Sequence, residues 1–340
     1  MIRLQAHLFE NLQDRSHLLA ALQTALQLEH ATLPPYLVAT YSLKDENAGI
    51  AELILDVTYE EMLHMTLVCN LINALGGSPS LNGPDFIPKY PGPLPGAVPD
   101  LIVPLARFDK NLLENVFMKI EAPEKPQDFP VIAAAESKPA RTIGQFYGLI
   151  KEIIREGGDA LFANGDPTRQ VIRRIDDDRS TAVTNAATAL AAIDLIVEQG
   201  EGTNESPLEA ATGEPAHYYR FAEILHGRAL QADSSRPEGF SYSGAPINFD
   251  EAAVYPVKEN LHVAEIPADS MARPIAEEFN RQYTRMLSHL HRGFNGELGQ
   301  INLAVNIMSN DLTSLARQLV QIEIEPGLNA GPTFEFAPLD

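Results

Sequence analysis

A carboxylate and an imidazole interrupt what is otherwise the apolar face of a predicted helix, at Glu61 and His64. Helical spacing places both in one row with Val57, Val68 and Leu71. Burying an unpaired carboxylate is costly, or it forces the group to take up a proton. We therefore expect a neutralising positive charge beside this face.

Two other segments share this feature. Glu214 and His217 repeat the Glu-x-x-His spacing and precede apolar residues on the same predicted face, and Glu29 lies on a predicted face with leucines. Residues three apart on a helix point the same way, so each Glu-x-x-His pair can offer a carboxylate and an imidazole to one metal ion. A pair of metal ions would supply the missing charge. Such ligands suit iron, with manganese or zinc as alternatives.

A dinuclear carboxylate bundle takes a single Glu from each of two helices and a Glu-x-x-His pair from each of two others. Glu29 is the first single Glu, and the second is either Glu152 or Glu121. Chain order favours Glu152, although it falls opposite the apolar stripe of its own helix. The predicted metal ligands are Glu29, Glu61, His64, Glu152, Glu214 and His217, with Glu121 as the alternative to Glu152.

Other polar residues nearby are expected to play lesser parts. Glu60 points about 100° away from Glu61 on an ideal helix, which places it beside the ligands or at the surface. Tyr36 and Tyr147 could act as redox-active phenols, but packing in the core is the favoured interpretation.

The chain is predicted to be all-α. Long helices are expected near residues 14–41, 49–75, 142–154, 185–198, 207–230, 275–294 and 298–321, with a short helix near 109–121. Two prolines, Pro34 and Pro35, fall inside the first helix and should free the carbonyls of His30 and Ala31 while bending the rod. A proline-rich crossover follows the second helix, because 12 of the 25 prolines lie in residues 79–139.

Composition excludes several classes of partner. The formal net charge of −21 argues against nucleic acid and anionic membranes, both of which need a basic protein surface. No apolar run approaches the roughly 20 residues that span a bilayer, and the N-terminus lacks a signal-peptide stretch. We expect a cytoplasmic protein with one inert buried thiol, Cys69, while its oligomeric state stays open.

Several runs together resemble the ferritin-like domain of the iminophenyl-pyruvate dimer synthase family. They are LEHATLPPYL (28–37), EEMLH (60–64), NALGG (73–77), YPGPLP (90–95), IEAPE (120–124) and HYYRFAEI (217–224). Members of that family couple two amino-acid-derived imines in violacein and rebeccamycin biosynthesis. The resemblance covers roughly residues 18–230 and implies a ferritin-like four-helix bundle. We expect this bundle at 1–230, followed by a helical extension at 231–340 that packs on it. The resemblance also places Glu29, Glu61, His64 and His217 at metal-ligand positions.

These features predict an oxidoreductase in which two iron ions use dioxygen or peroxide on a small amino-acid-derived, imine-like substrate. The alternatives are a non-catalytic iron-binding or peroxide-buffering protein, and a metal-free degenerate bundle that serves as a partner module. The long irregular crossover favours the enzyme, because an insertion of that length can build a substrate pocket.

Overall fold

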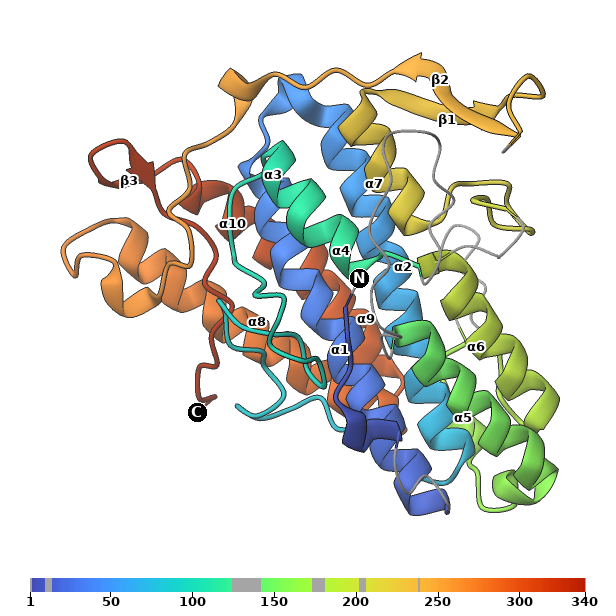
Figure 1. The fold of residues 1–340 in the computed structure, drawn as a ribbon. Coiled ribbons are helices and arrows are strands. Elements are labelled where there is room, and N and C mark those ends of the chain that lie inside the picture. Colours follow the sequence, from blue (N-terminus) through green and yellow to red (C-terminus); the bar gives the residue numbers. More distant parts are fainter. Residues whose placement is uncertain are drawn as a thin grey trace.

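Helices dominate the computed structural model, which describes residues 2–9, 14–123, 142–172, 181–201, 206–237 and 239–339 (Figure 1). The α-helices are α1 (Arg15–Ser42), α2 (Ala48–Ala74), α3 (Lys110–Leu112), α4 (Met118–Ile120), α5 (Ile143–Gly157), α6 (Ala186–Glu201), α7 (His217–His226), α8 (Ala272–Phe294), α9 (Gly299–Asn306) and α10 (Thr313–Leu319). Two π-helical turns, η3 (Leu113–Phe117) and η8 (Ile307–Leu312), join α3 to α4 and α9 to α10. The 3-10 turns are η1 (Ala6–Phe9), η2 (Asp45–Asn47), η4 (Gly158–Phe162), η5 (Pro167–Arg169), η6 (Glu251–Ala253) and η7 (Val263–Glu265).

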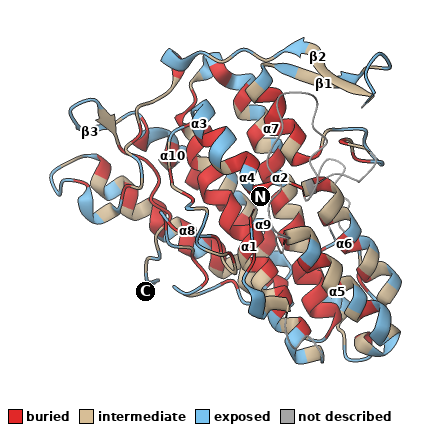
Figure 2. Ribbon diagram, viewed as in Figure 1, coloured by how far each residue is buried: buried red, intermediate tan, exposed pale blue. Residues whose placement is uncertain are grey.

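The two longest helices, α1 and α2, form an antiparallel hairpin at the centre of the molecule (Figure 1). The side chain of Asp14 caps α1 by accepting hydrogen bonds from the backbone N–H groups of Ser16 and His17. At the same end, the Arg15 guanidinium donates to the carbonyl of Leu75, just past α2. Both helices carry long buried faces (Figure 2), which confirms the two long helices predicted there.

Beside this hairpin lie two rows of shorter helices, and each row is interrupted near its middle. One row consists of the α3–η3–α4 segment and then α5, and the other consists of α6 and then α7 (Figure 1). α5 packs on α6 near one end of the hairpin, while α7 packs on η3 and α4 near the other. Both interruptions therefore fall at the same level along α1 and α2.

α1 remains helical through Pro34 and Pro35. Proline has no N–H, so Pro35 leaves the carbonyl of Ala31 without its usual partner four residues on. The hydroxyl of Tyr90 donates to that carbonyl over 2.6 Å and replaces the missing bond. Tyr90 belongs to the connection from α2 to α3, so part of the predicted proline-rich crossover is fastened directly to α1.

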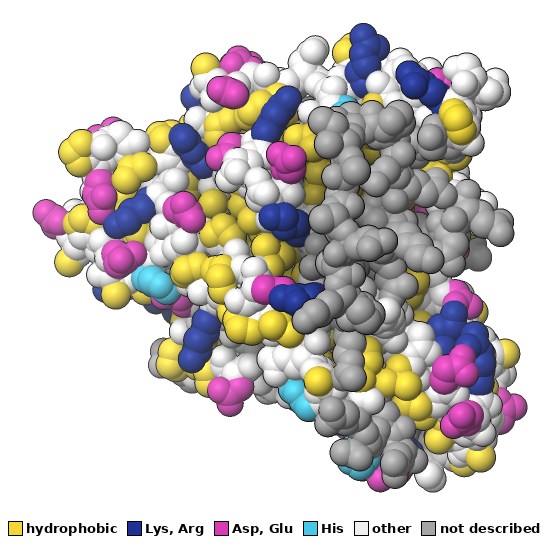
Figure 3. Space-filling model, viewed as in Figure 1, with side chains coloured by type: hydrophobic (Ala, Val, Ile, Leu, Met, Phe, Trp, Pro, Cys, Tyr) yellow, Lys and Arg dark blue, Asp and Glu magenta, His cyan; other side chains and the backbone are white. Residues whose placement is uncertain are grey.

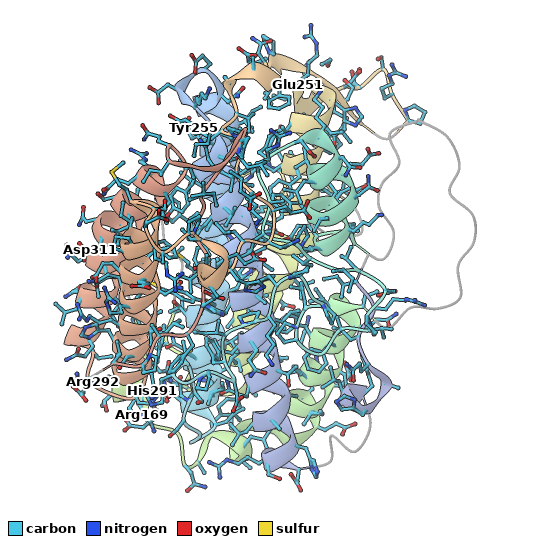
Figure 4. All side chains as sticks on the ribbon, turned by 90° about the vertical axis from the view of Figure 1, so that its left-hand side faces the viewer. Arg169, Glu251, Tyr255, His291, Arg292 and Asp311 are labelled. Atoms are coloured by element: carbon cyan, nitrogen blue, oxygen red, sulfur yellow. The ribbon has the colours of Figure 1, made fainter. Side chains whose placement is uncertain are left out.

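A second helical layer, made of α8, α9 and α10, covers one side of the hairpin (Figures 1 and 4). At one end of this layer Arg169 lies close to His291 and Arg292 (Figure 4) and donates to the side-chain oxygen of Asn295 over 2.5 Å. At the other end the backbone N–H of Tyr255 donates to the carbonyl of Ser42 over 2.7 Å. The predicted C-terminal helices are therefore present.

The all-α prediction missed two small antiparallel sheets. One pairs β1 (Arg228–Ala232) with β2 (Phe240–Pro246), and the other pairs β3 (Glu323–Glu325) with β4 (Leu328–Asn329). The predicted helix at 207–230 is also too long, because helical structure there is confined to α7 and residues 228–232 form β1.

No helix in the described ranges is both long and apolar enough to cross a bilayer. On the face in Figure 3, basic side chains lie singly among acidic and apolar ones.

Candidate metal centre

Five side chains converge where the two helical rows are interrupted. Glu29 comes from α1, Glu61 and His64 come from α2, Glu121 directly follows α4, and His217 is the first residue of α7. All five are buried, each with at most 8% of its surface exposed. They form two overlapping groups that can each hold a metal ion, with Glu61 shared between them.

The two histidines both aim Nδ1 at the shared carboxylate. His64 Nδ1 lies 3.6 Å from Glu29 Oε2 and 3.7 Å from Glu61 Oε1. His217 Nδ1 lies 2.9 Å from Glu61 Oε1 and 3.3 Å from Glu121 Oε2. The rings stack with their centroids 5.4 Å apart. The centre is therefore two half-sites joined by Glu61.

These spacings fit a coordinated metal ion. Two ligand atoms about 2.1 Å from one ion are about 3 Å apart at a right angle and about 3.4 Å apart at the tetrahedral angle. The nitrogen–oxygen separations of 2.9–3.7 Å lie around those values. Carboxylate oxygens and imidazole nitrogens are also the donor types that iron, manganese and zinc accept in proteins.

Hydroxyl groups hold the three carboxylates in place. Tyr147 donates to Glu29 Oε1, and Tyr36 donates to Glu121 Oε1. The shared Glu61 accepts a hydrogen bond of 3.1 Å from the hydroxyl of Thr32. Each carboxylate therefore keeps one oxygen anchored to the protein while its other oxygen faces a histidine.

Each histidine is also fixed through its second ring nitrogen. Nε2 of His64 lies 3.1 Å from the amide oxygen of Gln199, which accepts its hydrogen. Nε2 of His217 lies 2.9 Å from Glu60 Oε2, and Glu60 Oε1 accepts from Arg220 over 3.1 Å. Because Nε2 has an acceptor for its hydrogen in both rings, Nδ1 is the nitrogen that can release its proton and offer a lone pair to a metal ion.

The buried carboxylates at the centre need a neighbouring positive charge. Burial and the neighbouring Glu121 carboxylate raise the pKa of Glu61 to about 7. Burial also opposes ionisation of Glu60, but the hydrogen bond from His217 and the charge of Arg220 outweigh it and lower that pKa to about 2. Burial disfavours a charged His217, yet hydrogen bonds to Glu121 and Glu60 raise its pKa well above the ordinary value. A bound cation would take over the neutralising role of that imidazolium.

A cavity reaches the cluster from one side. Its inner end is formed by Glu29, Thr32, Glu61, His64 and Glu121. Its walls are mainly apolar and are formed by Leu28, Leu94, Ile120, Ile143, Gly144, Tyr147, Ile196, Val197 and Gly200. An apolar chamber that ends at a few converging polar groups is typical of a small-molecule site.

Comparison with known proteins identifies the family. The profile of the ferritin-like family matches residues 22–226, a span that holds all five converging side chains. The chain belongs to the ferritin-like family.

Curated relatives of this ferritin-like chain confirm the resemblance drawn from its motifs. It is 27% identical to a dichlorochromopyrrolate synthase of Lentzea aerocolonigenes, in an alignment covering 95% of this chain and 36% of the relative. It is 23% identical to a 2-imino-3-(indol-3-yl)propanoate dimerase of Chromobacterium violaceum, over 94% of this chain and 34% of that protein. The chain thus spans about a third of the length of the curated relatives it matches. Both relatives are biosynthetic enzymes.

A solved structure gives the same fold. A ferritin-like protein from Caulobacter vibrioides aligns with a TM-score of 0.62 and 23% identity, covering 94% of this chain and 97% of that one. The structural similarity therefore extends into the C-terminal layer.

Two predicted ligands of the ferritin-like centre lie elsewhere. Glu152 sits on the outer face of α5, its side chain 60% exposed and paired with Arg155 one turn on. Glu214 lies before α7, its side chain 62% exposed and 3.3 Å from Arg220. α7 begins only at His217, because Pro215 disfavours helical geometry in the residue before it, so the Glu-x-x-His spacing does not apply. Glu121, the alternative to Glu152, occupies the position expected of the second single Glu.

Sequence reasoning missed Gln199, the partner of His64, and Arg220, which holds the Glu60 partner of His217. Neither carries a short-range signal, because both act through contacts with residues far away in the chain. The signal for Glu121 was present: it follows the apolar residues Phe117 and Ile120, whereas Glu152 interrupts no apolar row. The order of the helices along the chain, which favoured Glu152, was the less reliable criterion for choosing the fourth carboxylate.

Proposed function

We propose that this chain binds two iron ions in the centre described above, with manganese or zinc as alternative metals. Glu29 and His64 would hold one ion, Glu121 and His217 would hold the other, and Glu61 would lie between them. The observation that carries the proposal is the pair of buried histidines that both point Nδ1 at one shared carboxylate. The hairpin and the two interrupted rows would then be the four helices of a ferritin-like bundle.

We further propose that the bundle occupies residues 1–230 and that residues 231–340 form an extension packed on it. The extension contacts α1 next to the proposed site. Tyr283 of α8 hydrogen-bonds to Nε2 of His30 over 2.9 Å, and His30 is the neighbour of Glu29 on α1. This contact ties α8 to α1 at the residue next to Glu29.

The proposed activity is that of an oxidoreductase acting on a small organic substrate with dioxygen or peroxide. An iron pair, when bound, supplies the electron transfer that such chemistry requires. The protein supplies an apolar approach to the carboxylates, lined by Leu28, Ile120 and Ile196. The hydroxyls of Tyr147 and Tyr36 hold Glu29 and Glu121, so the ligands keep one orientation while a substrate enters.

The proposed substrate class is an amino-acid-derived imine. Support comes from the name of one relative, which acts on 2-imino-3-(indol-3-yl)propanoate, and from the mainly apolar residues that line the cavity. Because the relatives are about three times longer, their full reactions need not be carried out by this chain alone. Nucleic acid and membranes are not proposed as partners, given the net charge of −21.

The second candidate function is non-catalytic iron binding or peroxide buffering. The metal centre would serve equally well for it. The cavity favours the enzyme, because a store that only exchanges iron and peroxide has no use for an apolar chamber at its ligands.

One experiment distinguishes the two proposed functions. The protein is loaded with ferrous iron without oxygen and then mixed with oxygen, with and without a tryptophan-derived imine generated by an amino-acid oxidase. The oxidase itself consumes oxygen and releases peroxide, so the uptake measured with metal-free protein is subtracted. We then expect iron-dependent oxygen uptake and a new oxidised product in mass spectra when the imine is present. Oxygen uptake that leaves the imine unchanged would support non-catalytic peroxide buffering instead. The Glu61→Ala variant, which lacks the carboxylate shared by the two half-sites, serves as the control.

A further inference from the structure

The two halves of the centre are matched in most respects. Each half has one histidine and one carboxylate of its own, and both share Glu61. The carboxylate of each half accepts a hydrogen bond from a buried tyrosine: Glu29 from Tyr147, and Glu121 from Tyr36. A difference in metal affinity between the halves must therefore come from what lies beyond these groups.

The halves differ in the group that accepts the hydrogen of Nε2. His64 donates to Gln199, a neutral amide that is 2% exposed. His217 donates to Glu60, an anionic carboxylate. An anionic acceptor makes the imidazole a stronger electron donor at Nδ1 than a neutral acceptor does, and it favours the positive charge of a bound metal.

Arg220 keeps Glu60 in place without cancelling this difference. Its guanidinium lies 3.1 Å from Glu60 Oε1, 3.3 Å from Glu214 Oε2 and 3.8 Å from Glu209 Oε1. One positive charge thus meets three carboxylates, so the surroundings of His217 stay formally negative. On the His64 side, by contrast, the group that accepts the Nε2 hydrogen is the neutral amide of Gln199.

The halves also differ in access. The cavity is lined by both His64 and Glu29 of one half but only by Glu121 of the other, because His217 and Glu60 are not among the described residues that line it. The side chains of both histidines are buried, His64 2% and His217 0% exposed. An ion at the His64 side would face the cavity through two of its own ligands, and an ion at the His217 side through one.

We infer that Glu60, held by Arg220, is the positioning residue that makes the His217 half of the centre bind its metal ion more tightly than the His64 half. The inference rests on the proposed dinuclear site and adds an order to it: the His217 position fills first and empties last. The His64 position, which faces the cavity, is then the exchangeable one.

The test is anaerobic calorimetric titration of the full-length, metal-free chain with ferrous iron. The wild type should give two binding steps. His217→Ala should remove the tighter step and His64→Ala the weaker one. Glu60→Gln keeps an oxygen that can accept from Nε2 but removes its charge, so it should weaken the tighter step by about tenfold or more and leave the weaker step in place.

The reciprocal variant is Gln199→Glu, which gives His64 the charged acceptor and should tighten the weaker step. Glu52→Gln is the matched control, because Glu52 is an exposed carboxylate on α2 and its loss changes only surface charge. Circular dichroism of each metal-free variant checks folding, and if Glu60→Gln does not fold, Gln199→Glu decides alone.

Two equal steps in the wild type, or a weaker step that responds to Glu60→Gln in place of the tighter one, would overturn the inference while leaving the dinuclear site intact. A Gln199→Glu chain whose weaker step stays unchanged would also overturn it. A wild-type chain that binds no iron would instead defeat the proposed function itself.

Discussion

At the scale of single residues, substitutions of Glu121 and Glu152 should have opposite effects on metal binding. Glu121→Gln should abolish most metal binding at the His217 side, because the buried carboxylate lies 3.3 Å from His217 Nδ1. Glu152→Gln should leave metal binding unchanged and cost at most about 0.5 kcal/mol of stability, since it removes only an exposed pair with Arg155. Iron content of the two reconstituted variants checks this, and equal losses would refute the assignment.

Tyr147 provides a second residue-level test. Tyr147→Phe removes the donor to Glu29 while keeping the ring that packs in the core. Losing such an outer partner typically lowers metal affinity by about tenfold. Competition with a calibrated chelator measures the change, and an affinity equal to that of the wild type would mean that the hydroxyl does not orient Glu29.

At the scale of secondary-structure elements, the hydrogen bond from Tyr90 to Ala31 explains how α1 tolerates a proline in its interior. Tyr90→Phe should cost about 1–2 kcal/mol in wild type, because the carbonyl of Ala31 would be left buried without a partner. In a Pro35→Ala background the new backbone N–H can bond that carbonyl, so the same change should cost less. Denaturant unfolding of the four chains gives the coupling, and additive effects would contradict this account.

The sequence predicts those elements best whose signal is local. The caps at Asp14 and Thr142 and the apolar periodicity of α1 and α2 mark helices that the structure contains. The late start of α7, at His217, has a weaker signal in the sequence. A helix starting near Pro207 satisfies the same apolar pattern, and only the glycine and proline around Glu214 argue for a later start. The small sheets at β1–β2 and β3–β4 are short pairings without a long alternating pattern.

The same distinction applies to the site. Glu29, Glu61, His64 and His217 could be predicted because each carries its charge on an apolar helix face, which the cost of burial makes conspicuous. Gln199, the partner of His64, could not, since the sequence separation of 135 residues between them leaves no periodic signature.

At the scale of the whole molecule, loading the centre should stabilise the fold, because five buried polar side chains from four segments meet there. An ion that binds only the folded chain adds about 2.7 kcal/mol of stability at a free concentration a hundred times its dissociation constant. Thermal unfolding with and without iron measures this effect, and Glu61→Ala should remove most of the shift. A midpoint that iron does not move would contradict it.

The central claim is that the chain holds two metal ions between its interrupted helical rows. Metal-free protein is incubated anaerobically with excess ferrous iron, desalted, and analysed for iron per chain. The account predicts about two ions per chain, one for each histidine of the centre. A content below about half an ion per chain would contradict it.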